Sequence, residues 1–151
     1  MEIFTVSFFG HRDIYDYRKI DKLLPPIIKD LLRTKYYVAF LVGRNGDFDI
    51  YVASIVKQVQ NELGKENSDL TLVLPYNVKD MEYYENYYDG ILIPAELYKA
   101  HPKAAITLKN RYMVESSDLV IVNVERKSGG AYTAMKYAEK LNKEVINIAI
   151  L

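Results

Sequence analysis

Five short apolar runs alternate with helical patterns along the 151 residues, and this alternation limits the chain to few folds. The runs are rich in β-branched and aromatic residues and almost continuously apolar, which is typical of parallel strands buried on both faces. We expect strands at Ile3–Phe9, Tyr36–Val42, Leu70–Leu74, Leu119–Val124 and Glu144–Ile150. The alternation predicts a three-layer α/β fold with a mostly parallel sheet of about five strands.

The segments between these runs carry apolar residues at helical spacing. We expect helices over Ile20–Leu32, Val52–Leu63 and Ala131–Leu141, and a shorter helix over Lys103–Ser116. Pro25-Pro26 predicts a kink or a late start in the first helix, and Gly64 is a suitable stop for the second. The length suits one domain, so we expect a single domain over residues 1–151.

The composition excludes several classes of site and partner. The chain has no Cys and only two His, far apart, so we expect neither a metal site nor thiol chemistry. Its 20 basic and 20 acidic residues cancel, which argues against nucleic acid as a partner. No run is long enough to span a membrane and the N-terminus lacks a signal-peptide pattern, so we expect a cytoplasmic protein.

The charge is uneven along the middle of the chain. Residues 79–96 hold five acids and one base, and residues 99–111 hold four bases and no acid. Four tyrosines at helical spacing lie in the acidic stretch, namely Tyr83, Tyr84, Tyr87 and Tyr88. They suit a half-buried helix, or else an aromatic wall beside a ligand or a dimer face. The tyrosines and the neutral net charge favour a homodimer.

Polar residues follow the first expected strand, where parallel sheets bind ligands. Gly10 allows the backbone to turn tightly or approach a ligand, Arg12 has the shape to hold a phosphate, and His11 could exchange a proton. The alternative is an ordinary surface turn.

The second expected strand is followed by Gly43 and two acids. Asp47 is a natural N-cap for the next helix, and Asp49 would lie in its first turn, where the helix dipole favours a carboxylate. Either acid could instead bind ribose hydroxyls.

Ser128, Gly129 and Gly130 follow the fourth expected strand and open the last helix. Free backbone N–H groups and the helix dipole make such a turn suitable for a phosphate, and Thr133 can add a hydroxyl. The alternative is a plain loop with Ser128 as N-cap. On the preceding helix, Asn110 lies among apolar neighbours and needs partners, so it and Arg111 are expected to point toward the same edge.

Together these segments resemble the SLOG superfamily, which groups the Smf/DprA and Lonely-Guy proteins, and most of all its small YpsA/YspA-type branch. The matching segments are FFGHR (Phe8–Arg12), VGRNGDFD (Val42–Asp49), KNRYMVESSDLVIV (Lys109–Val122) and SGGAYTAMKYA (Ser128–Ala138). The resemblance implies a Rossmann-like fold that binds a nucleotide or nucleotide derivative at the carboxyl edge of the sheet. It places the phosphate against Gly129-Gly130 and implies no other cofactor.

One departure from the family bears on catalysis. The catalytic Glu of Lonely-Guy enzymes, which cleave an N-glycosidic bond, falls at Lys136, and a lysine cannot supply that carboxylate. We therefore expect a small-molecule nucleotide sensor. One alternative is an enzyme that acts on nucleoside monophosphates as an N-glycosidase, a deoxyribosyltransferase or a phosphoribohydrolase. Its catalytic residue would be Asp49, Glu115 or His11, and Asp47 is a further candidate for the carboxylate. The other is a nucleic-acid or protein interaction module using the basic stretch.

Overall fold

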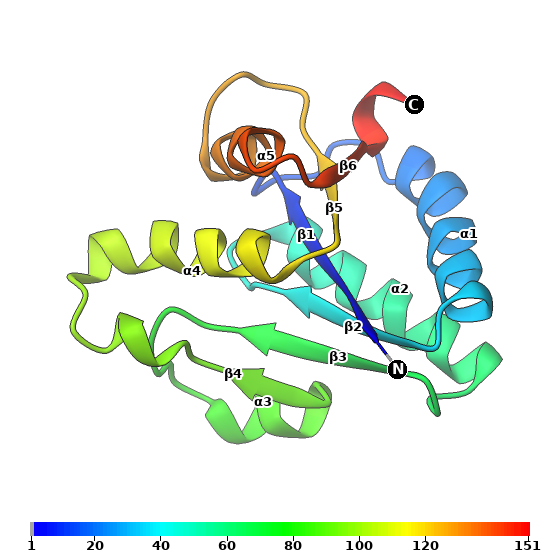
Figure 1. Ribbon diagram of the computed structural model, residues 1–151, viewed down its shortest axis with the longest axis horizontal. Coiled ribbons are helices and arrows are strands. Elements are labelled where there is room, and N and C mark those ends of the chain that lie inside the picture. The colour runs from blue at the N-terminus through cyan, green and yellow to red at the C-terminus, as the bar shows by residue number, and fades with distance from the viewer. Residues whose placement is uncertain (1) are drawn as a thin grey trace.

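The computed structural model describes residues 2–151, which form a six-stranded parallel sheet with helices on both faces (Figure 1). In chain order the elements are β1 (Ile3–Gly10), α1 (Arg18–Thr34), β2 (Tyr37–Val42), α2 (Asp47–Leu63), β3 (Ser68–Val73), α3 (Met81–Tyr87), β4 (Gly90–Leu92), α4 (Pro102–Ser116), β5 (Leu119–Asn123), α5 (Gly130–Lys140) and β6 (Glu144–Asn147). Two 3-10 turns, Ala95–Leu97 and Ile148–Ile150, complete the chain. The expected three-layer α/β fold is confirmed.

The strand order β4-β3-β2-β1-β5-β6 places β1 at the centre, and every neighbouring pair is parallel. The chain first moves outward from β1 to β4, and then returns to the other side of β1 with β5. The order therefore reverses between β1 and β5. Loops that leave these two strands diverge, and this opens a crevice at the carboxyl edge of a parallel sheet.

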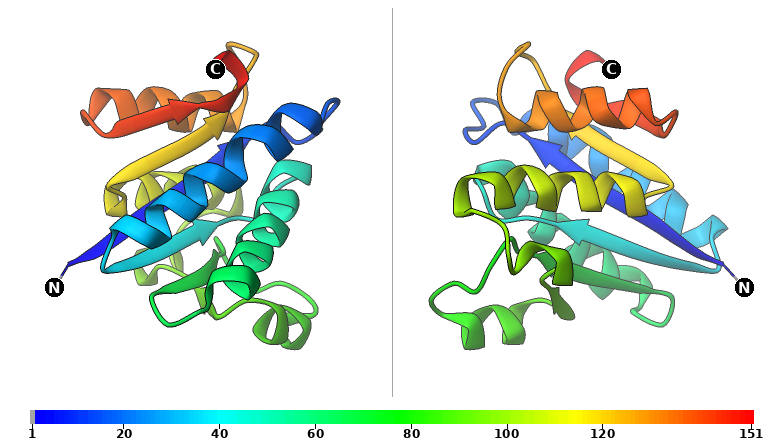
Figure 2. Two further views of the ribbon diagram at one scale, coloured as in Figure 1. Left: turned by 90° about the vertical axis from the view of Figure 1, so that its right-hand side faces the viewer. Right: turned by 60° about the vertical axis from the view of Figure 1, so that its left-hand side comes forward.

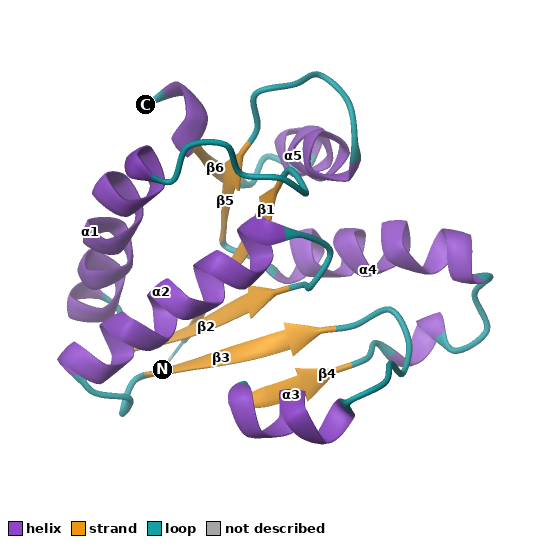
Figure 3. Cartoon of the chain, turned by 180° about the vertical axis from the view of Figure 1, so that it is seen from behind, coloured by secondary structure: helices purple, strands orange, loops and turns teal. Residues whose placement is uncertain are grey.

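Each face of the sheet has its own core. Val6 and Phe8 of β1 pack with residues of α1 and α2, while Phe9 packs with residues of α4 and α5. Figure 3 shows α1, α2 and α3 over the first face, and the right-hand view of Figure 2 shows α4 and α5 side by side over the second. Three small residues, Ala131, Ala134 and Ala138, are buried where α5 meets the sheet.

The prolines do not delay α1, which begins at Arg18 and continues through Pro25 and Pro26. The late start is therefore a wrong prediction. The prolines deprive the carbonyls of Asp21 and Lys22 of their helical donors, but both of these residues are exposed, so water can replace the donors.

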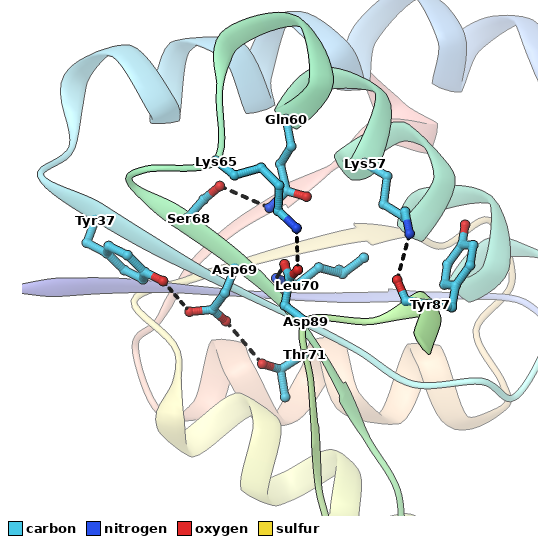
Figure 4. A network of polar contacts seen from close by, with 10 residues as sticks. All are labelled: Tyr37, Lys57, Gln60, Lys65, Ser68, Asp69, Leu70, Thr71, Tyr87 and Asp89. Carbon is cyan, nitrogen blue, oxygen red and sulfur yellow. Dashed lines mark hydrogen bonds and ion pairs between the residues drawn. The ribbon is translucent and has the colours of Figure 1, made fainter. Parts of the chain in front are cut away.

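The outer edge of the sheet contains a strand that the expected five did not include. The strand β4 has only three residues, and a polar network links its surroundings to β3 and α2 (Figure 4). Asp89 accepts hydrogen bonds from the Leu70 N–H at 2.7 Å and from Lys65 Nζ at 2.5 Å. Lys57 Nζ donates to the Tyr87 carbonyl at 2.6 Å, which ties α2 to the end of α3.

The last expected strand is shorter in the structure, because the chain turns at Asn147 into Ile148–Ile150. The Asn147 side chain accepts from the N–H groups of Val124 and Ala149 and so holds this turn against the end of β5.

Within residues 2–151 there is no helix long and apolar enough to cross a membrane.

Candidate functional site

A pocket of about 350 Å³ opens at the carboxyl end of β1, between the loops that follow β2 and β5, where the strand order reverses. It lies under α4 and beside the start of α5. Its lining brings together residues from four separate segments of the chain: Phe8, Phe9, Gly10, His11, Arg12, Gly43, Asn45, Asp49, Ile106, Lys109, Asn110, Met113, Arg126, Gly129, Gly130 and Ala131. Many of the residues expected from the sequence to form a site therefore meet here, with Gly129 and Gly130 at the helix start.

The turn after β1 is held against the start of α2. A side chain at Gly10 would overlap the buried ring of Phe48, so this position needs glycine because of packing inside the protein. The Arg12 carbonyl accepts from the Asp47 N–H at 2.7 Å. These contacts fix the backbone of Arg12, while its exposed side chain lies at the pocket.

His11 acts as a hydrogen-bond acceptor in this structure. Its Nε2 atom accepts from the backbone N–H of Glu125 at 3.0 Å and of Arg126 at 3.1 Å. Burial lowers the pKa of the imidazole, and the nearby Arg126 guanidinium lowers the pKa further. The neutral ring therefore fastens the loop after β5, and its Nε2 lone pair is already used by these two donors.

Asp49 and Lys109 form the floor of the pocket. A methyl group added to Gly43 would lie 2.6 Å from Lys109 Nζ and 3.2 Å from Asp49 Oδ2, so both charged groups reach the end of β2. Asp49 Oδ2 accepts from the Asn45 N–H at 2.8 Å. Burial raises the pKa of Asp49, while Lys109 and the Asn45 N–H oppose that rise.

Lys109 is 2% exposed although it lies on α4, and no ion pair to it occurs within residues 2–151. Burial lowers its pKa, and the Asp49 charge partly offsets that effect. Lys109 was not among the site residues predicted from the sequence. The signal available was its place at the start of the KNR segment, one residue before Asn110.

Asn110 is also incompletely satisfied. Its buried Oδ1 atom has no hydrogen-bond partner in the part of the chain that the structure describes. A buried polar atom without a partner is costly, which makes Asn110 a candidate for contact with a bound group. Asn110 Nδ2 lies 3.8 Å from the position that a side chain at Gly130 would take.

The start of α5 differs in detail from the expectation. Gly129, with φ +91°, is the N-cap, and Ser128 provides no side-chain cap and does not line the pocket. The Thr133 hydroxyl donates back to the Gly129 carbonyl at 3.0 Å. The helix N-terminus therefore presents its backbone N–H groups without a side chain in front of them.

A second hollow, the α4–α5 groove, has a volume of about 450 Å³ and adjoins the pocket. It is lined by Thr107, Asn110, Arg111, Gly130, Thr133, Ala134, Lys136, Tyr137 and Lys140. Arg111 and Thr133, both expected at the site, thus face this groove rather than the pocket.

Three expected residues lie outside both hollows, namely Ser128, Asp47 and Glu115. Asp47 is the first residue of α2 rather than its N-cap, because Gly46 takes that place. Glu115 accepts a hydrogen bond from the Tyr137 hydroxyl. The three catalytic candidates Asp49, Glu115 and His11 are therefore not gathered at one point. Among residues 2–151 no cluster of His, Asp and Glu could hold a metal ion.

The tyrosines of the acidic stretch lie on and after α3, beside β4. Tyr84 and Tyr87 are half-buried against the core, as one of the two interpretations expects, and Tyr83 is 63% exposed. None of them lines the pocket.

Two solved structures of DNA processing protein A have this architecture. The protein from Helicobacter pylori, described with its single-stranded DNA binding mode, aligns with a TM-score of 0.63 and 20% identity over 94% of this chain and 63% of its own. DprA from Streptococcus pneumoniae aligns with a TM-score of 0.66 and 16% identity over 95% of this chain and 49% of its own. The chain has the DprA fold. This agrees with the resemblance to the SLOG superfamily.

Curated sequences give a second comparison. Probable DNA-directed RNA polymerase delta subunits from Streptococcus equi subsp. equi and subsp. zooepidemicus are each 28% identical over 113 residues, or 75% of this chain. The chain spans about half the length of these curated relatives, since the match covers 54% of each. No family model matches the chain.

These findings correct two expectations. The similar proteins are named for DNA processing, single-stranded DNA binding and RNA polymerase, so the small-molecule nucleotide sensor and its N-glycosidase alternative are wrong. The exclusion of nucleic acid is wrong as well. It relied on the sum of all charges, whereas Arg12, Lys109 and Arg126 converge on one pocket.

Proposed function

We propose that the chain binds single-stranded DNA through the pocket at the carboxyl edge of the sheet. The observation that carries this proposal is the convergence of Arg12, Lys109 and Arg126 beside the open N-terminus of α5, in a chain with no net charge. A phosphate in this position would meet backbone N–H groups and cationic side chains together. The fold shared with DprA supports the proposal, because one of those proteins is described as binding single-stranded DNA.

The shape of the site favours a single strand. Its deepest cation, Lys109, is almost fully buried, so a phosphate must enter the pocket to approach it. A flexible strand can bend its backbone into a pocket of about 350 Å³, whereas a duplex presents its phosphates on a stiff convex surface. The unpartnered Oδ1 of Asn110 is an acceptor, which suits an N–H group of a base.

The proposal is tested by fluorescence anisotropy with a labelled oligodeoxythymidylate. We expect Arg12→Ala to weaken binding roughly tenfold, because it removes a charge-assisted hydrogen bond to phosphate. The matched control is Arg33→Ala, which removes an exposed arginine from the last turn of α1, next to the opposite edge of the sheet. The proposal fails if the wild-type chain does not retain the oligonucleotide, or if the two variants bind it equally well.

Three finer expectations stay predictions. They are the place of the chain in the YpsA/YspA-type branch, its organisation as a single domain and its location in the cytoplasm. The homodimer also stays a prediction, since the structure holds one chain.

A further inference from the structure

The α4–α5 groove has a strong local charge. Of the nine residues that line it, Arg111, Lys136 and Lys140 are cationic and none is acidic. Two of the three cations come from α5 and one from α4, so the packing of the two helices collects them. The groove is therefore suited to an anion.

The groove and the pocket are parts of one path. Asn110 and Gly130 line both hollows, so a ligand that leaves the pocket past Gly130 enters the groove directly. Asn110, whose buried Oδ1 has no partner among the described residues, stands at this junction. The volume of each hollow lies in the range of roughly 300–1,000 Å³ that is typical of small-ligand sites. A single nucleotide is a ligand of this size.

The side chains of the groove offer contacts to more than a phosphate. The Arg111 guanidinium lies 5.4 Å from the centre of the Tyr137 ring, and the Tyr137 hydroxyl donates to Glu115, one helical turn after Arg111 on α4. Tyr137 is thus held in place as a flat surface. Lys136 lies 3.1 Å from Glu139, but both side chains are about half exposed, so this ion pair can be exchanged at low cost.

We propose that the α4–α5 groove is a second nucleotide subsite for single-stranded DNA, next to the first one in the pocket. This inference rests on the proposed function. One phosphate lies in the pocket near Lys109, and the strand passes Gly130. The next phosphate lies among Arg111, Lys136 and Lys140, with its base against Tyr137. Aromatic surfaces beside a cationic path are how proteins hold a single strand without reading its sequence.

The first test measures anisotropy with the full chain and an oligodeoxythymidylate at several salt concentrations. We expect Lys140→Glu to weaken binding about tenfold. The milder Lys140→Gln is expected to reduce the slope of log affinity against log salt by about 0.7, the value for one phosphate contact. The control is Lys22→Glu, which makes the same change of charge on an exposed position of α1. Circular dichroism confirms that each variant is folded.

The second test uses an oligonucleotide with 5-iodouracil and identifies the crosslinked residue by mass spectrometry. We expect the crosslink at Tyr137 and none at Tyr83, which is 63% exposed on α3 and serves as an internal control. Loss of the crosslink in Lys140→Glu, together with the weaker binding, supports the second subsite.

The outcomes separate the two proposals. If the wild-type chain binds no single-stranded DNA, both fail. If Arg12→Ala weakens binding while Lys140→Glu and Lys22→Glu behave alike, the pocket binds DNA and the second subsite is wrong. If Lys140→Glu changes the molecular mass in solution without changing DNA affinity, the groove is an interface between copies of the chain, and the inference is again wrong.

Discussion

Single residues at the site serve more than one purpose, and this limited what the sequence could predict about them. Gly10 and His11 were expected near a ligand because of their place after a strand, and both do line the pocket. Their contacts, however, are with Phe48 and with two backbone N–H groups of a loop more than a hundred residues later. Lys109 was missed because nothing in a sequence shows that a lysine on a surface helix is buried.

His11 makes the loop after β5 sensitive to pH. Burial holds the folded-state pKa of His11 below the value of about 6.5 expected for the unfolded chain. A group with a lowered folded pKa gives its full stabilisation above the unfolded value and loses it as the pH falls through the folded value. We therefore expect the amide resonances of Glu125 and Arg126 to shift together on acidification, because protonated Nε2 cannot accept their hydrogen bonds.

The matched variants for this prediction are His11→Ala and His101→Ala. Removal of His11 is expected to cost about 1 kcal/mol of stability, as for an ordinary hydrogen bond, and to abolish the shared shift. Removal of His101, whose ring accepts from the Lys103 N–H at 3.2 Å, is expected to leave the loop unchanged. An unaltered titration of both amides in His11→Ala would show that the loop does not depend on this ring.

At the scale of elements, the periodicity of apolar residues predicted the long strands and helices. The residue types at the ends of the helices did not predict the N-caps correctly. The strand β4 has only three residues, too few for a readable period, so the five expected strands did not include it. It becomes a strand by pairing with β3, an interaction between separate segments that the pattern does not contain. Asp47 and Ser128 both looked like N-caps, yet Gly46 and Gly129 take those places.

Because of the network around Asp89, the stability of the outer edge of the sheet should depend on this one carboxylate. Burial alone would raise the pKa of Asp89, but hydrogen bonds from Lys65 and from the Leu70 N–H hold the pKa below its usual value. We expect Asp89→Ala to lower the free energy of unfolding by about 2 kcal/mol, since the Leu70 N–H loses its acceptor. Asp89→Asn keeps an acceptor and should cost less.

Urea denaturation at several pH values measures both effects. Because the folded pKa of Asp89 is lowered, its stabilisation is complete above the unfolded value of about 3.9 and disappears as the pH falls through the folded value. The difference between wild type and Asp89→Ala should therefore shrink in acid. A difference that stays constant down to acid pH would mean that the charge of Asp89 does not contribute.

For the whole molecule, the net charge said little about binding partners. The fold places acidic and basic residues in different regions, whereas the net charge adds them together. The acids of residues 79–96 lie around α3 and β4 at one edge of the sheet, while Arg12, Arg111, Lys136 and Lys140 lie around the pocket and the groove. Screening at physiological salt reduces interactions beyond about 8 Å, so a phosphate at the pocket responds to the nearby cations and little to the distant acids.

This separation predicts that the salt dependence of DNA binding follows local charge and not net charge. Glu82→Gln/Glu85→Gln removes two negative charges from α3, and Arg12→Ala/Lys140→Ala removes two positive charges from the pocket and the groove. The first pair should leave the slope of log affinity against log salt unchanged, because the same side chains still bind the phosphates. The second pair should reduce the slope by about 0.7 for each phosphate that is no longer neutralised. If the two pairs shift the slope by equal and opposite amounts, binding follows the total charge of the protein, and the pocket has no special part in it.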